Sequence, residues 1–143
     1  YLLVYDFDNS PAVRKLAVRI AAERGLHIYS VFKIPYAERC FSLCGPENFL
    51  GLVQGADFVL SNSFHATAFS VIFEREFAVV ERTEKINTRM RDFTAMLGLS
   101  DHMVTMETEI PAGTDWTAVR RCLKDEIDHA KAYIDEVLRD VER

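Results

Sequence analysis

The residues best suited to chemistry form one short segment, Ser61-Asn62-Ser63-Phe64-His65-Ala66-Thr67, in the middle of the chain. It follows an apolar run at 57–61, typical of a buried strand, and it opens an apolar stretch at 64–73, typical of a helix buried on several sides. The unpaired backbone N–H groups of a helix start, together with the helix dipole, favour an anion. The segment is therefore placed to bind a phosphate or a carboxylate.

The side chains of this segment fit the same ligand. Ser61, Ser63 and Thr67 supply hydroxyl donors, and His65 supplies a group that titrates near neutral pH. The alternative is structural: Ser63 would cap the helix and His65 would make only a local hydrogen bond. On spacing alone the two interpretations are about equally supported.

The surrounding elements predict how this segment is held. Apolar runs indicate five strands, and amphipathic or apolar patterns indicate the helices between them. The expected strands are 2–7, 26–32, 57–61, 77–80 and 103–106; the expected helices are 11–24, 46–55, 64–73, 90–97 and a long one at 115–143; 33–45 and 82–88 are expected to be loops. Strict alternation predicts one α/β domain over 1–143, a Rossmann-like three-layer fold with a parallel sheet in the order 2-1-3-4-5.

In such a sheet, ligands bind beyond the carboxyl ends of the strands where the strand order reverses. The segments 6–10 and 61–65 should meet at that point. Asn87-Thr88-Arg89 follows the fourth strand and belongs to the same edge. An Arg there would be able to grip a carboxylate or phosphate at two points; the alternative is an ordinary surface Arg at a helix start.

Asp6-Phe7-Asp8 offers a rival chemistry. A strand ending in Asp-x-Asp is typical of haloacid-dehalogenase-like phosphotransferases, with Asp6 as nucleophile and Asp8 as acid. Such a site also needs a later Lys and a carboxylate pair for Mg²⁺. The fifth expected strand is followed by Glu107-Thr108-Glu109, and no suitable Lys stands out. A response-regulator receiver is disfavoured as well, because Ser61 occupies the position of its phosphoacceptor Asp.

Composition narrows the classes of function. The chain has 143 residues, 49% of them hydrophobic, and a net charge of −5, which argues against nucleic acid as a partner. Its apolar runs fall short of the ~20 residues of a membrane span. The three cysteines suggest a reducing compartment. Cys40 and Cys44 lack further ligands at zinc-site spacing, so we expect free, buried thiols and no metal.

The ends of the chain suggest a larger protein. Tyr1-Leu2-Leu3 begins inside an expected strand, with neither Met nor a leader before it. We therefore expect a domain of a longer protein. The far end of the last helix is expected to lie against the missing part or against a partner.

Two stretches resemble the polysaccharide pyruvyl transferases. They are Gly45-Pro46-Glu47-Asn48-Phe49-Leu50 and Ala56-Asp57-Phe58-Val59-Leu60-Ser61-Asn62-Ser63-Phe64-His65-Ala66-Thr67-Ala68-Phe69-Ser70. The family shows a "P-E-x-F-L … A-D … S-F-H-G-T-A-F-S" pattern and a later "N-x-R", matched by Asn87 and Arg89. The resemblance covers about 1–99. Ala66 stands where Gly is usual and would narrow the room beside the anion site, and Glu76 stands where Pro often precedes Phe77.

The resemblance implies the C-terminal half of a two-domain, GT-B-like enzyme with its active site between the domains. It implies transfer of a pyruvyl group from phosphoenolpyruvate to a pair of sugar hydroxyls as a ketal, without a cofactor. His65 would be the catalytic residue, as an acid/base or as a phosphate binder. The substrate would contact Ser61, Asn62, Ser63, Phe64, Thr67, Asn87 and Arg89.

The partners would be an N-terminal domain, phosphoenolpyruvate and a glycan or lipid-linked sugar, in the cytoplasm or at the inner face of the membrane; the oligomeric state is left open. The 143 residues alone are expected to be inactive. Two other functions stay open: a nucleotide-sugar glycosyltransferase domain, and a non-catalytic anion-binding or interaction module.

Overall fold

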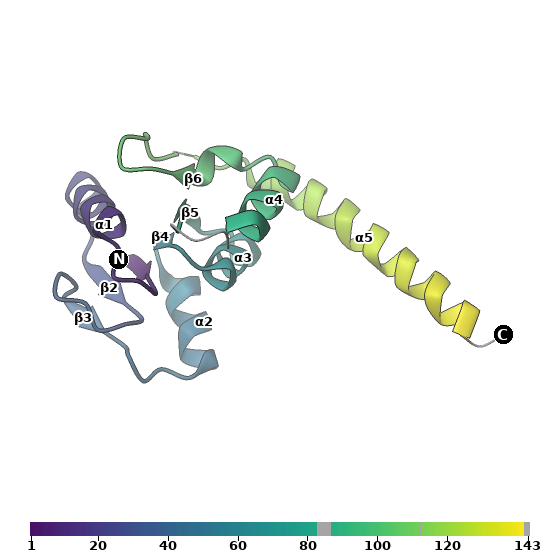
Figure 1. The fold of residues 1–143 in the computed structure, drawn as a ribbon, viewed down its shortest axis with the longest axis horizontal. Helices are drawn as coiled ribbons and strands as arrows, with labels where there is room; N and C mark the ends of the chain where they lie inside the picture. Colours follow the sequence, from purple (N-terminus) through teal and green to yellow (C-terminus); the bar gives the residue numbers. More distant parts are fainter. Residues whose placement is uncertain (83–86, 112, 142–143) are drawn as a thin grey trace.

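The computed structural model describes residues 1–82, 87–111 and 113–141 and shows a parallel sheet between two layers of helices (Figure 1). Its strands are β1 (Leu2–Tyr5), β2 (Ile28–Ser30), β3 (Arg39–Cys40), β4 (Phe58–Ser61), β5 (Glu76–Val80) and β6 (Met103–Val104). They lie in the order β3-β2-β1-β4-β5-β6, and every pairing is parallel. The α/β class is therefore confirmed.

The five expected strands keep their predicted relative order, but the expected count is wrong by one. The additional strand, β3, lies in the stretch 33–45, which was expected to be a loop. It pairs with β2 at Tyr29 and Ser30. Both residues of β3 are exposed, so this edge strand is held by backbone pairing and leaves no apolar pattern in the sequence.

The helices alternate with the strands, as expected. They are α1 (Pro11–Arg24), α2 (Pro46–Gly55), α3 (Phe64–Ile72), α4 (Thr88–Met96) and α5 (Trp116–Val141), with a 3-10 turn η2 (Ser100–His102) before β6. Gly25 ends α1 in the left-handed conformation, with φ of 65°, which a residue without a Cβ adopts at no steric cost.

Alternation along β1 divides the core into two parts. Leu2 and Val4 pack under α1 on one face of the sheet. Leu3 points to the other face, which α2, α3, α4 and the start of α5 cover. Successive side chains of a strand point to opposite faces, so one short apolar run supplies both cores. This arrangement leaves the loops after the strands together at one edge of the sheet.

The helix α5 is attached to the domain only near its beginning. Asp115 caps it, because its carboxylate accepts hydrogen bonds from the backbone N–H groups of Thr117 and Ala118. Val119 is buried against the sheet, and the Arg120 guanidinium pairs with the Glu74 carboxylate at 2.6 Å. Beyond these turns the helix extends away from the body of the protein (Figure 1).

The start of α5 is also tied to the sheet through Glu76, the first residue of β5. Its carboxylate accepts hydrogen bonds from the backbone N–H and the hydroxyl of Thr114.

Among the described residues, no helix has the length and apolarity that a membrane crossing requires.

Candidate functional site

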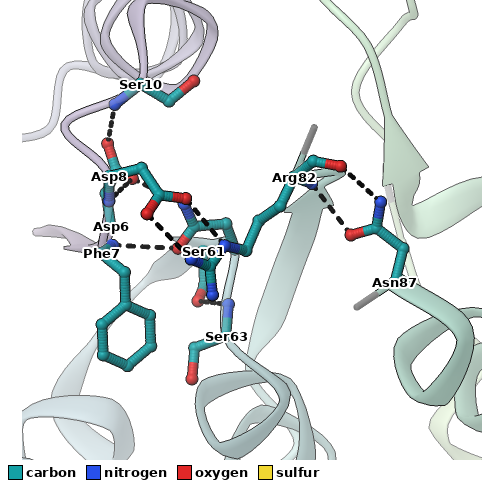
Figure 2. Close-up of polar contacts among 9 residues, drawn as sticks. Asp6, Phe7, Asp8, Ser10, Ser61, Ser63, Arg82 and Asn87 are labelled. Carbon is teal, nitrogen blue, oxygen red and sulfur yellow. Dashed lines mark hydrogen bonds and ion pairs between the residues drawn. The ribbon is translucent and has the colours of Figure 1, made fainter. Parts of the chain in front are cut away.

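Asp6, directly after β1, organises the edge of the sheet where the strand order reverses (Figure 2). Its side chain is buried, and its carboxylate accepts hydrogen bonds from the backbone N–H groups of Asp8 and Ser10. A third bond, at 2.6 Å, comes from the side-chain amide of Asn62 after β4. One buried carboxylate therefore fixes both the loop after β1 and the segment that leads into α3.

Asn62 completes this connection in the other direction. Its side-chain oxygen accepts a hydrogen bond from the backbone N–H of Phe7 at 3.1 Å. Both ends of the amide are thus engaged with the loop after β1, and the residue is buried. Asn62 was expected to contact substrate; in the structure its side chain connects two loops by hydrogen bonds.

Arg82 connects a third loop, the one after β5, to the same place. Its guanidinium makes two hydrogen bonds to the Asp8 carboxylate, at 2.7 and 2.9 Å, and lies over the ring of Phe7. The Asn87 side-chain amide bonds to both the backbone N–H and the backbone carbonyl of Arg82 (Figure 2). Asn87, also expected to contact substrate, therefore holds the loop that carries Arg82; residues 83–86 of the expected loop 82–88 lie outside the described residues.

The hydroxyls of the segment 61–67 mostly shape its turn. The Ser61 hydroxyl accepts a hydrogen bond from the Ser63 backbone N–H, and the Thr67 hydroxyl donates to the Ser63 carbonyl. Ser63 stands at the N-cap position of α3 but makes no side-chain cap bond. The Ser63 side chain therefore does not occupy the first N–H groups of α3. These N–H groups can be used to bind an anion.

His65 and Arg89 are the two predicted site residues that present polar groups at the surface. Both lie against Phe64, the first residue of α3. The His65 ring is 6.3 Å from the Phe64 ring, edge to face, and the Arg89 guanidinium carbon lies 5.4 Å from the ring centre. Phe64 also packs edge to face on Phe93 of α4. The start of α3 thus carries an imidazole and a guanidinium around one aromatic ring.

His65 also lines a pocket of about 420 Å³. It is lined by Tyr5, Val31, Phe32, Phe41, Ser42, Cys44, Gly45, Pro46, Phe49, His65 and Phe69. Burial raises the pKa of Tyr5, so its phenol stays protonated at neutral pH. The lining holds no Asp, Glu, Lys or Arg, and its chemistry suits an uncharged group.

Ala66 is fully buried in the core cluster beside α3. The Ala66 methyl group, which was expected to narrow the room beside the anion site, therefore packs inside the protein.

The phosphotransferase alternative does not fit this geometry. Asp6, the expected nucleophile, is buried with its carboxylate occupied by three donors, and Asp8 is paired with Arg82. Within the described ranges, no three His, Cys, Asp or Glu side chains gather in a way that would hold a metal ion.

The expectation of buried thiols is wrong for Cys40. This residue is exposed because it lies on the edge strand β3, whereas Cys44 and Cys122 are half-buried. All three are free thiols.

Comparison with protein families supplies the assignment. The model of the family "Polysaccharide pyruvyl transferase" matches residues 1–84, more than half of the chain. The chain belongs to the polysaccharide pyruvyl transferase family. Comparison with curated proteins and with solved structures gives no significant match.

The match to this family includes the segment 61–67 with His65, but it ends before Asn87 and Arg89. The matched range is also shorter than the expected 1–99. The roles of His65 and Arg89 in catalysis and binding remain predictions, because the structure establishes only their positions.

Arg82 was missed by the sequence analysis. In the sequence it is one of the basic residues of a polar stretch and stands two positions after β5. Its partner Asp8 is 74 residues away, so only the folded sheet edge brings the two together.

Proposed function

We propose that this domain takes part in transferring a pyruvyl group from phosphoenolpyruvate to a pair of sugar hydroxyls, forming a cyclic ketal during polysaccharide synthesis. The observation that carries the proposal is the exposed His65 at the uncapped start of α3, with Arg89 on the same aromatic ring. Family membership supports a pyruvyl transferase in polysaccharide biosynthesis.

The reaction requires one proton donor and an anion site close together. The methylene carbon of the enol must gain a proton while a sugar hydroxyl attacks the neighbouring carbon and loses its own proton. A second hydroxyl then attacks the same carbon and gives up its proton as the bond to the phosphate oxygen breaks, so the ketal closes and phosphate leaves carrying that proton. His65 is the group that exchanges protons, and the N–H groups at the start of α3 stabilise the phosphate as it leaves.

The two substrates should occupy different regions next to His65, because Arg89 does not line the pocket. Arg89 and the start of α3 offer positive charge for the carboxylate and phosphate of the donor. The pocket lined by Tyr5, Phe32 and Phe49 carries no formal charge and suits the sugar ring. The aromatic faces and edges of such a pocket complement the apolar face of a sugar.

The rest of the enzyme is part of the same proposal. A GT-B-like partner domain would close over this edge of the sheet, where Phe7 and Leu43 are exposed. The acceptor would be a glycan or lipid-linked sugar, and the reaction would take place in the cytoplasm or at the inner membrane face.

A protection experiment tests the assignment against a nucleotide-sugar glycosyltransferase. Hydrogen exchange at the start of α3 would be followed with phosphoenolpyruvate and with a panel of UDP-sugars. Protection by phosphoenolpyruvate and not by the UDP-sugars is expected; the reverse pattern would assign the glycosyltransferase. Protection by phosphoenolpyruvate, with no phosphate released when the full-length protein is supplied with phosphoenolpyruvate and sugar acceptors, would indicate a non-catalytic anion-binding module.

A further inference from the structure

The outer part of α5, from Ile127 onward, exposes more apolar surface than is usual for a helix surrounded by water. Ile127, Tyr133, Ile134, Val137 and Leu138 are each between 42% and 69% exposed. They lie on the part of the helix that leaves the body of the protein (Figure 1). An apolar stripe of this kind marks a contact surface.

The spacing of the stripe is that of a coiled coil. Leu123, Ile127, Ala130, Ile134 and Val137 follow one another at steps of 4, 3, 4 and 3 residues. We call these five residues the α5 seam. In heptad terms, Ile127 and Ile134 occupy positions a, and the other three occupy positions d. In this register Arg120 falls at position a and Val119 at position g, so the apolar pattern begins at Leu123. Leu123 still packs partly against the core of its own domain, and the other four seam residues are exposed.

We propose that the α5 seam pairs with the seam of a second copy of this chain as a parallel, two-stranded coiled coil. β-Branched residues at positions a favour two parallel strands, and both exposed a positions are Ile. The flanking position g holds Tyr133, which meets Leu138 at position e of the second copy. This pair adds an apolar contact beside the seam.

The charges beside the α5 seam select the parallel orientation. In a parallel pair, a residue at g faces the residue five positions later on the other helix. Glu126 at g therefore faces Lys131 at e of the second copy, and the symmetry forms this ion pair twice. In an antiparallel pair with these layers in register, Lys131 would face Lys131 of the second copy.

The same charges argue against a lipid surface as the occupant. Between residues 124 and 139 the helix carries three basic side chains, Lys124, Lys131 and Arg139, and five acidic ones. Helices that lie on anionic membranes have basic polar faces.

Mass measurement by light scattering tests the proposal on the chain itself. At about 100 µM, a concentration at which weak dimers with micromolar Kd are populated, the chain should approach twice its 16.4 kDa. Ile134→Lys should return the mass to that of a monomer. Ala132→Lys places the same charge at the outward position f of the same helix and should leave the dimer intact. Circular dichroism should show equal helicity in the two variants.

Charge exchange tests the orientation. Glu126→Lys and Lys131→Glu should each weaken dimerisation about threefold or more, and the double variant should restore it. A monomeric chain at this concentration, or a dimer that resists Ile134→Lys, would overturn the proposal; a monomer would point to coverage of the seam by another part of a longer protein. A double variant as weak as the single ones would overturn the parallel arrangement.

Discussion

The Asp6 carboxylate and the Asn62 side-chain amide are joined by a 2.6 Å hydrogen bond across 56 residues of sequence. The bond links the loop after β1 to the segment that positions His65. The bond is buried, so if one partner were removed, water would not supply a substitute hydrogen bond to the other. The site therefore depends on a contact between two residues that need not touch substrate.

Asn62→Ala should lower the free energy of unfolding by about 2 kcal/mol, because the buried Asp6 carboxylate loses a donor and the Phe7 N–H loses its acceptor. Urea denaturation measures the change. Asn48→Ala removes an exposed amide and should change stability by less than about 0.5 kcal/mol. Equal losses in both variants would show that the Asp6–Asn62 link is not important for stability.

His65→Ala should reduce kcat by about 100-fold or more in an active pyruvyl transferase that contains this domain, the scale expected for losing a general acid or base. Folding should be unaffected, because the side chain is exposed. His129→Ala, at an exposed position of α5, is the matched control and should keep full turnover. Turnover retained by His65→Ala would move the chemistry to another residue.

Arg89→Ala should raise the KM for phosphoenolpyruvate more than it lowers kcat, because it removes a binding contact to an anion. Initial rates at varied phosphoenolpyruvate measure both constants. Arg91→Ala on the same helix is the control: Arg91 is exposed and paired with Glu81, and its loss should leave KM unchanged. A KM that responds equally to both substitutions would indicate a general charge effect.

Tyr36→Phe should not destabilise the protein at neutral pH, because the buried Tyr36 hydroxyl has no hydrogen-bond partner among the described residues. Burial, with a smaller contribution from the Asp6 carboxylate, raises the pKa of Tyr36 to about 12. The unfolded chain would ionise this phenol near pH 10, so the native protein loses stability as pH rises from about 10 to 12.

The Tyr36→Phe protein has no phenol to ionise, so it should not show this loss of stability between about pH 10 and 12. Thermal melts at pH 7 and pH 11 measure the difference between the two proteins. An identical pH dependence in both would contradict the raised pKa of Tyr36.

Much of the fold follows from local patterns. The side chains of β1 alternate between the two cores, and Pro11 and Gly25 mark the two ends of α1. Both elements could therefore be predicted without tertiary information. The strand β3 could not, because Arg39 and Cys40 are both exposed and supply no apolar residue to the core. Hydrophobic patterns do not report such an edge strand.

For the candidate site residues, the sequence predicted their place in the fold better than their contacts. The exposure of His65 at the start of α3 follows from a strand–turn–helix pattern. The hydrogen bonds of Asp6 to the N–H groups two and four residues later resemble an Asx-type turn, a local preference of Asp. Its bond to Asn62 and the pairing of Arg82 with Asp8 depend on segments far apart in sequence, which only the assembled sheet brings together.

The attachment of α5 has a mechanical consequence. Glu74 and Glu76 hold its beginning, through Arg120 and Thr114, while the rest of the helix lacks support from the domain. A rod of 26 residues is about 39 Å long at ~1.5 Å per residue, so a tilt of about 10° at the clamped end displaces the tip by roughly 7 Å. The beginning of α5 is attached at the turn between α3 and β5. A small repacking of that turn would therefore cause a larger displacement at the far end of the helix.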